Sequence, residues 1–461
     1  MLVKELRQGM RTNLFTAAFI LLQAFMILCA IVGSQSRGEP EVTSGFFWTF
    51  VIAALLVVMP IRGFSALVQE NKLNTMDLIQ LTKLSAWRIA FGKWASLVAQ
   101  SLLLVCGVLP YLVMRYFFGG IDVVTELAIL FWVVVASMLL TAVTVGMSAF
   151  QSVLLRSAVA VGLLFLTVSS SSAIMMWSRY SGGPGGAGTG RWWFFLSLFV
   201  VAAYGVFFFL DLGASRIAPD AENFATRKRS LGLLFMTVLL LSPLLGMERE
   251  PAVALAVAVA CFLCLDALTE RPSVLPSVLR PFAGRFWARP LAPLLLPGWH
   301  TGMLYLVAVV AAFALLSWVT ISDPKDYFDL EGRQVAAGIV GTLTFPLIVI
   351  QLFFHRRTHT QTFFNIYVVV QCCVAVIGLF LTAVSESTPL KGAGYLLCPI
   401  PFVSFLAAMN DHESDILLIL AIVFTGIAFL MTLWRGWPLF RQTNATLRHM
   451  RREEGASRAD R

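Results

Sequence analysis

Long apolar runs recur along the whole of this chain of 461 residues, and they limit what it can fold into. Hydrophobic residues make up 58% of the sequence and charged residues 13%, whereas soluble domains carry about 25% charged residues. A run of about 20 apolar residues can cross the hydrocarbon core of a bilayer. Because backbone groups in lipid must bond within their own segment, each run is predicted to be a helix. We therefore predict an all-α polytopic membrane protein with about 12 transmembrane helices, at 14–33, 45–66, 94–114, 127–150, 157–177, 192–212, 231–247, 251–269, 302–321, 334–354, 363–384 and 415–434.

The basic residues are distributed unevenly between the loops, and this distribution orients the spans. If the N-terminus is cytoplasmic, 25 of the 34 Lys and Arg residues fall in cytoplasmic segments. Cytoplasmic loops of membrane proteins carry an excess of Lys and Arg, so we predict that both termini face the cytoplasm. Segments 178–190 and 385–414 are then expected to face outward. This orientation, with contact to anionic membrane lipids, accounts for the net charge of +9, and nucleic acid is not an expected partner.

Residues 1–13 precede the first span and have an amphipathic pattern. Val3, Leu6 and Met10 lie on one helical face, and the basic side chains lie on the opposite face. This pattern predicts an interfacial helix that leads into the first span. An ordinary basic anchor is the alternative interpretation.

The chain divides near residue 230 into two halves of six predicted spans each. The first domain, 1–229, ends in a basic linker, and the second, 230–461, ends in a basic cytoplasmic tail. The longest cytoplasmic loop of the second half, 270–300, is rich in proline, which argues against one continuous helix there. This loop follows the second span of its half, as segment 70–93 does in the first half. The second half is therefore either a divergent repeat of the first or an unrelated additional membrane domain.

Segment 70–93 is a charged, helix-capable loop between the second and third spans. Asn74 can cap a helix with Asp77 three residues on, as in a capping box. Leu78 and Leu81 then contribute to a short apolar face, and Ser85 offers a second cap for the helix entering the next span. The pattern predicts a short helix along the membrane that docks against a soluble partner. An amphipathic connector resting on lipid is the alternative.

The same segment resembles the coupling segment of type-2 ABC export permeases, whose usual pattern is close to E-x-G-T-L-E-L-L-L-x-T-P-L-S-P-W-x-I-x-x-G-K. Here residues 74–93 read NTMDLIQLTKLSAWRIAFGK. Asn74, Lys83 and Ala86 stand where the family has a glycine and two prolines. The N-terminal run VKELRQGMRTNLFTAAFILLQ is similar to the leading helix and first span of the same family. The C-terminal half matches much less clearly.

This resemblance implies the permease subunit of an ATP-driven exporter in a bacterial inner membrane. A separate ATPase subunit, two per complex, would bind ATP and Mg, a second permease chain would complete the assembly, and this chain would hold no cofactor. The residues expected to couple the chain to the ATPase are Glu70, Asn74, Thr75, Asp77, Leu78, Leu81, Ser85 and Lys93. Two other classes stay open: an ATP-independent secondary transporter or channel, and a non-transporting membrane scaffold or regulator.

The sequence contains no recognisable catalytic motif. It has no Walker A run, no zinc-protease motif and no nucleophile elbow, so neither an enzyme nor a metal site is expected. Almost no ionisable residue is expected at mid-membrane, which argues against a secondary transporter. The fifth predicted span is unusually polar, and its hydroxyl groups line a substrate route or mediate close helix packing. These residues are Thr167, Ser169, Ser170, Ser171 and Ser172.

Overall fold

The regular elements of the described residues are all helices, and eleven helical segments are long and apolar enough to cross a membrane. The all-α, multi-pass membrane protein predicted from the sequence is thereby confirmed. The predicted span at 157–177 lies almost wholly outside the described residues. A computed structural model describes residues 2–35, 40–67, 85–118, 122–150, 156–157, 160, 189–219, 222–247, 249–273, 275–284, 290–320, 330–353, 360–387, 400–409 and 414–459.

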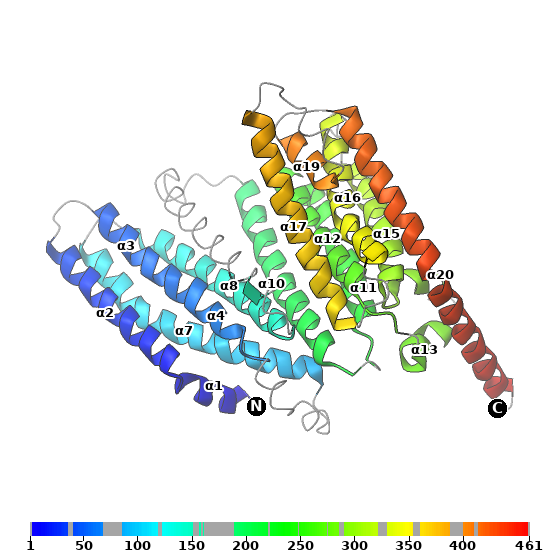
Figure 1. Ribbon diagram of the computed structural model, residues 1–461. Coiled ribbons are helices and arrows are strands. Elements are labelled where there is room, and N and C mark those ends of the chain that lie inside the picture. Colours follow the sequence, from blue (N-terminus) through cyan, green and yellow to red (C-terminus); the bar gives the residue numbers. More distant parts are fainter. Residues whose placement is uncertain are drawn as a thin grey trace. The chain divides into compact units, whose positions relative to one another are not determined.

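The chain forms two compact units, Met1–Ala218 and Pro219–Arg461 (Figure 1). The domain boundary expected at 229/230 falls inside a helix of the second unit, Phe224–Leu241. Unit 1 contains α1 (Leu2–Met10), α2 (Asn13–Gln35), α3 (Pro40–Ile52), η1 (Ala53–Val58), α4 (Met59–Gly63), α7 (Ala86–Phe118), α8 (Val123–Ser148) and α10 (Thr189–Ile217). Buried side chains such as Met26, Val51 and Leu104 form its apolar core.

The second span of unit 1 is interrupted by a π-helical turn, η1, which is followed by Pro60 in α4. In a π-helical turn each carbonyl accepts from the N–H five residues further on. For Leu55 that residue is Pro60, which has no N–H, so the Leu55 carbonyl has no donor within the helix. The hydroxyl of Ser137 on α8 donates to this carbonyl at 2.7 Å. About three turns further along α8, the hydroxyl of Ser148 accepts the backbone N–H of Leu67 at 3.2 Å. Helix α8 is therefore hydrogen-bonded to the second span at two positions about three turns apart.

Unit 2 is also a helical bundle, and its helices differ more from expectation than those of unit 1. Segment 270–300 contains two short helices and not one continuous helix, as its prolines indicate, and segment 385–414, expected as an outward loop, contains another. Its elements are α11 (Phe224–Leu241), η3 (Ser242–Leu245), α12 (Arg249–Thr269), α13 (Pro276–Gly284), α14 (Ala292–Leu295), α15 (Trp299–Thr320), α16 (Leu330–Phe353), α17 (Thr360–Ser387), α19 (Pro401–Met409) and α20 (Asp415–Ala459).

The last helix, α20, has 45 residues and continues far past the span predicted at 415–434. Leu447 and Met450, in this continuation, pack against an apolar cluster on α13 and the loop around α14. In Figure 1, α13 lies beside the red end of α20 within unit 2. The continuation of α20 is therefore packed on one side by the rest of its own unit.

Candidate functional sites

Polar side chains form the first candidate site, at the end of unit 1 that carries α1. Arg62 on α4 donates to the carbonyl of Gly9 at 2.9 Å and to the hydroxyl of Thr12 at 3.0 Å. Its other terminal nitrogen donates to the side-chain carbonyl of Gln100 on α7. The guanidinium also lies 5.4 Å from the centroid of the Phe15 ring, within range of a cation–π interaction. One side chain of the second span thus binds both the α1–α2 turn and α7.

A second polar contact joins α1 to the start of α7. Lys93 Nζ lies 3.7 Å from Glu5 Oε2, and the Lys93 side chain is largely buried. Gln100 lies two helical turns further along α7, so both side chains fall on the face that packs against α1. Helix α7 begins directly after Ser85, whose carbonyl accepts the N–H of Arg88 at 3.0 Å. Ser85 therefore occupies the N-cap position of α7.

The helices that contact α1 at this site are the two that flank segment 68–84. Of the residues expected to couple the chain to an ATPase, Ser85 and Lys93 lie at the start of α7. The others lie outside the described residues: Glu70, Asn74, Thr75, Asp77, Leu78 and Leu81. The polar residues of the fifth predicted span, Thr167 and 169–172, also lie outside them.

A buried ion pair joins three helices at the opposite end of unit 1. Arg115 Nη1 on α7 lies 3.1 Å from Glu126 Oε2 on α8. The second terminal nitrogen of Arg115 donates to the hydroxyl of Ser44 on α3 at 2.8 Å. The guanidinium lies 4.3 Å from the centroid of the Phe47 ring. These contacts fix the relative positions of the three helices and neutralise both charges.

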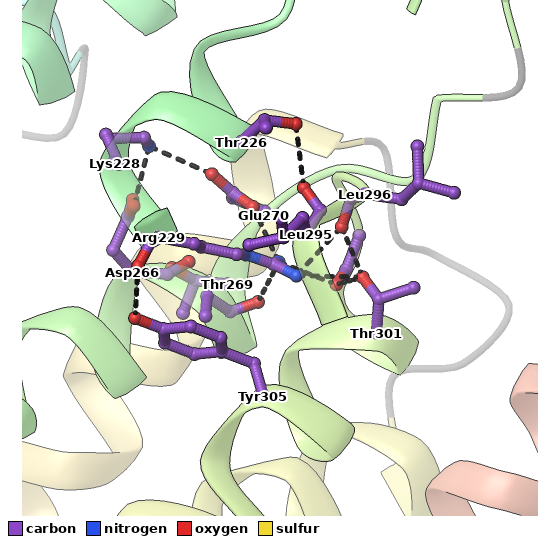
Figure 2. A network of polar contacts seen from close by, with 12 residues as sticks. Thr226, Lys228, Arg229, Asp266, Thr269, Glu270, Leu295, Leu296, Thr301 and Tyr305 are labelled. Carbon is purple, nitrogen blue, oxygen red and sulfur yellow. Dashed lines mark hydrogen bonds and ion pairs between the residues drawn. The ribbon is translucent and has the colours of Figure 1, made fainter. Parts of the chain in front are cut away.

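Unit 2 contains a larger buried network where α11 and α15 begin and α12 ends (Figure 2). Lys228 Nζ lies 2.6 Å from Asp266 Oδ2 and 2.9 Å from Glu270 Oε1. The other oxygen of Glu270, Oε2, lies 2.7 Å from Arg229 Nη2. The two carboxylates are four residues apart and so share one face at the end of α12. Two cations and two carboxylates therefore balance one another in a buried environment.

Arg229 also binds the backbone of the loop that leads into α15. Its Nη1 donates to the carbonyls of Leu294 and Leu296, each at 2.8 Å. Its Nη2 donates to the carbonyl of Gly298 at 3.2 Å. The side chain is only 1% exposed. Glu270 and these carbonyl groups thus replace the water that a guanidinium would otherwise bind.

Two hydroxyl groups complete the network. Thr226 on α11 donates to the carbonyl of Leu295 at 3.0 Å, so three consecutive carbonyls of the α14 region accept hydrogen bonds from α11. Tyr305 on α15 donates to the backbone carbonyl of Arg229 at 2.9 Å. The network therefore joins α11, α12, the α14 loop and α15 through a single arginine.

Ionisable residues are buried in the candidate spans, close to the ends of those spans. Asp211, Lys228, Arg229 and Asp266 are buried within candidate spans, at 0 to 3% exposure. All four lie within two turns of a span end, which is why a search for charges at mid-membrane passes over them. The sequence does contain a signal for the buried network. Lys228 and Arg229 are adjacent at the start of one span, and Asp266 and Glu270 lie four residues apart at the end of the next.

Close packing of α12 and α15 depends on Gly302, where a Cβ would lie 2.0 Å from the carbonyl oxygen of Ala267. We expect Gly302→Ala to lower the free energy of unfolding by about 1–3 kcal/mol, because a backbone carbonyl cannot move aside as a side chain can. Thermal unfolding of the purified protein in detergent measures the effect. Gly426→Ala is the matched control, since a Cβ there has no neighbour within 4 Å. Equal unfolding temperatures for the two variants would contradict this prediction.

The described residues contain no group of three or more His, Cys, Asp or Glu side chains that could hold a metal ion. The chain matches no known protein family, no curated protein and no solved structure.

Proposed function

We propose that this chain is the membrane-spanning permease subunit of an ATP-driven ABC exporter. It lies in a bacterial inner membrane with both termini in the cytoplasm. The supporting observation is that Arg62 and Lys93 join α1 to the two helices that flank segment 68–84. A soluble partner that pushes on this segment displaces α4 and α7 together with α1, because polar contacts connect all three. The coupling-like sequence of residues 74–93 lies where such a force enters.

The partner in this proposal is a separate ATPase subunit, two per complex, which binds ATP and Mg. A second permease chain, the same or a related one, completes the complex. Leu78 and Leu81 provide the apolar contact with the ATPase, and Glu70 and Asp77 border it. Closure of the ATPase dimer pushes segment 68–84 and tilts the helices of unit 1. This chain contributes no catalytic residue and holds no cofactor.

Leu78→Asp tests the proposal directly. The substitution places a charge in the contact with the ATPase. Desolvating this charge costs about 2–4 kcal/mol of binding free energy. We expect near-normal membrane abundance with loss of ATPase association and of transport. A pull-down of the ATPase, normalised to membrane-inserted protein, measures the effect.

Gln80→Asp is the matched control, because it places the same charge about 200° around the predicted helix from residue 78. It should retain the ATPase. If Leu78→Asp also retains the ATPase, or if both variants only lower membrane abundance, segment 68–84 is a connector resting on lipid and the proposal fails.

An ATP-independent transporter is the second candidate, and the buried ionisable residues of the spans favour it. Buried ionisable residues in membrane helices often line ion or proton routes. Asp211 and Asp266 are the acidic residues to test. Proteoliposomes that contain this chain alone, with an imposed proton or sodium gradient, separate the two candidates. Substrate uptake without an ATPase, abolished by Asp211→Asn at unchanged membrane abundance, supports the second candidate. Asp266→Asn also breaks the ion pair with Lys228, so it counts only if membrane abundance is unchanged.

A further inference from the structure

Helix α20 continues well past the end of its apolar segment. Trp434 and Trp437 are 75% and 54% exposed, and exposed tryptophans near the end of a span mark the membrane–water interface. Along a straight helix, Arg448 lies about 16 Å and Arg452 about 22 Å past Trp437. The headgroup layer is only about 5–8 Å thick on each side of the bilayer. Both arginines therefore lie beyond the lipid headgroups.

Three arginines on this extension share one face. Arg441, Arg448 and Arg452 follow helical spacing with Ala445 between them, and all four residues are exposed. We refer to Arg441, Arg448 and Arg452 as the arginine stripe. From residue 435 to residue 452 the sequence has five arginines and no Asp or Glu. Glu453 and Glu454 follow directly, so the excess of positive charge is greatest around Arg441 and Arg448.

The side of α20 opposite the stripe is packed against its own unit. Leu447 and Met450 contact a cluster that contains Val278 and Phe282 of α13. Leu296 belongs to the same cluster, and its carbonyl accepts a hydrogen bond from Arg229. The support for the stripe is thus connected through Leu296 to the buried network of α11, α12 and α15. A partner bound to the stripe would therefore contact a helix that is packed against the rest of unit 2.

We propose that the arginine stripe is a docking surface for an acidic face of a soluble protein. Complementary charge is the basis, because the stripe offers three exposed cations and the sequence from 435 to 452 contains no acidic residue. Lipid headgroups are a poor occupant for Arg448 and Arg452, since both lie past the headgroup layer and electrostatic attraction falls off within about 8 Å at physiological ionic strength. The inference relies on the cytoplasmic orientation proposed above, but it does not depend on the ATPase that docks at segment 68–84.

The test uses the Ala445→Cys variant and measures how fast a water-soluble maleimide labels the thiol at position 445. A protein bound to the stripe would slow this labelling. Inverted membrane vesicles expose the cytoplasmic side. Labelling of this variant should be several-fold slower in native vesicles than after a high-salt wash, because salt weakens contacts between opposite charges. Adding the dialysed wash fraction back should restore protection, and adding protease-treated wash should not. Protection that survives the salt wash, or that returns with protease-treated wash, would overturn the proposal.

Two charge reversals in the Ala445→Cys background show whether the stripe itself is responsible. Arg448→Glu, one helical turn from residue 445, should abolish the protection. Arg280→Glu reverses an exposed arginine on α13 and should leave the protection intact. Equal effects of the two reversals would contradict a specific role for the stripe.

Proteoliposomes test the lipid alternative. The Ala445→Cys protein, reconstituted with phosphatidylcholine alone or with added phosphatidylglycerol, should label at the same rate in both. Slower labelling with phosphatidylglycerol would identify anionic lipid as the occupant and overturn the proposal. Labelling of Ala445→Cys from outside intact cells would show that the cytoplasmic orientation is wrong. Failure of the ATPase proposal is measured separately, by ATPase binding of Leu78→Asp.

Discussion

Replacing Arg229 by Met should destabilise unit 2 severely. The substitution removes the donor to the carbonyls of Leu294 and Leu296 and leaves Glu270 paired with Lys228 alone. Removing one partner from a buried ionic network costs about 3–5 kcal/mol, because the remaining charges stay desolvated. That is a large part of the roughly 5–15 kcal/mol by which a typical domain is stable. Membrane abundance and thermal unfolding in detergent should both fall sharply.

Two neighbouring variants show whether the effect arises from the network. Arg229→Lys should remain destabilised, because one ammonium group cannot replace a planar guanidinium that binds a carboxylate and several carbonyls at once. Arg227→Met is the matched control; Arg227 lies 5.1 Å from the Phe224 ring centroid, a contact worth about 0.5–1 kcal/mol at a partly exposed site. Near-normal stability of Arg229→Met would mean that the network contributes little to the fold.

Arg62→Met should separate ATPase binding from transport. The variant loses the hydrogen bonds from α4 to Gly9, Thr12 and Gln100, each worth about 1.5–3 kcal/mol when the donor is charged. Segment 68–84 is unchanged in sequence, so the ATPase should still bind. Transport should fall about tenfold or more, because a loss of 1.4 kcal/mol of coupling free energy already gives a tenfold change.

Arg11→Met is the control for this experiment, since Arg11 is an exposed arginine on the same α1–α2 turn. It removes the same charge without removing a bond to α4 or α7, and transport should stay near normal. Transport and ATPase binding that fall together in Arg62→Met would show that the residue supports the fold and has no separate role in coupling.

The spans could be predicted from the sequence because hydropathy is a local property. The run predicted at 302–321 is observed as α15, Trp299–Thr320, and the run at 251–269 as α12. The end of α20 was harder to predict, since hydropathy shows only where the membrane segment ends. The helix continues because residues 439–459 are rich in strong helix formers such as Leu, Arg, Ala and Glu. Pro60 was a visible signal for the irregular turn in the second span.

The partners of the polar side chains could not be predicted from the sequence. Arg62 and Gly9 are 53 residues apart, and Lys228 and Asp266 are separated by a complete span and turn. A single sequence gives the spacing within one helix but not which helix packs beside it. The sequence around Arg62 therefore does not indicate that this side chain binds the α1–α2 turn and α7. The coupling residues at 70–81 remain a prediction, because they lie outside the described residues.

The length of α20 makes it a lever. From the middle of its membrane segment, near Thr425, to Arg452 the helix is about 40 Å long. A tilt of about 10° around that midpoint, small beside the range seen for membrane helices, moves its far end sideways by about 7 Å. The same tilt hardly displaces residues near the fulcrum. Such a rotation would move the far end of α20 together with the α13 cluster packed on it, and a distance between two spin labels would record the displacement.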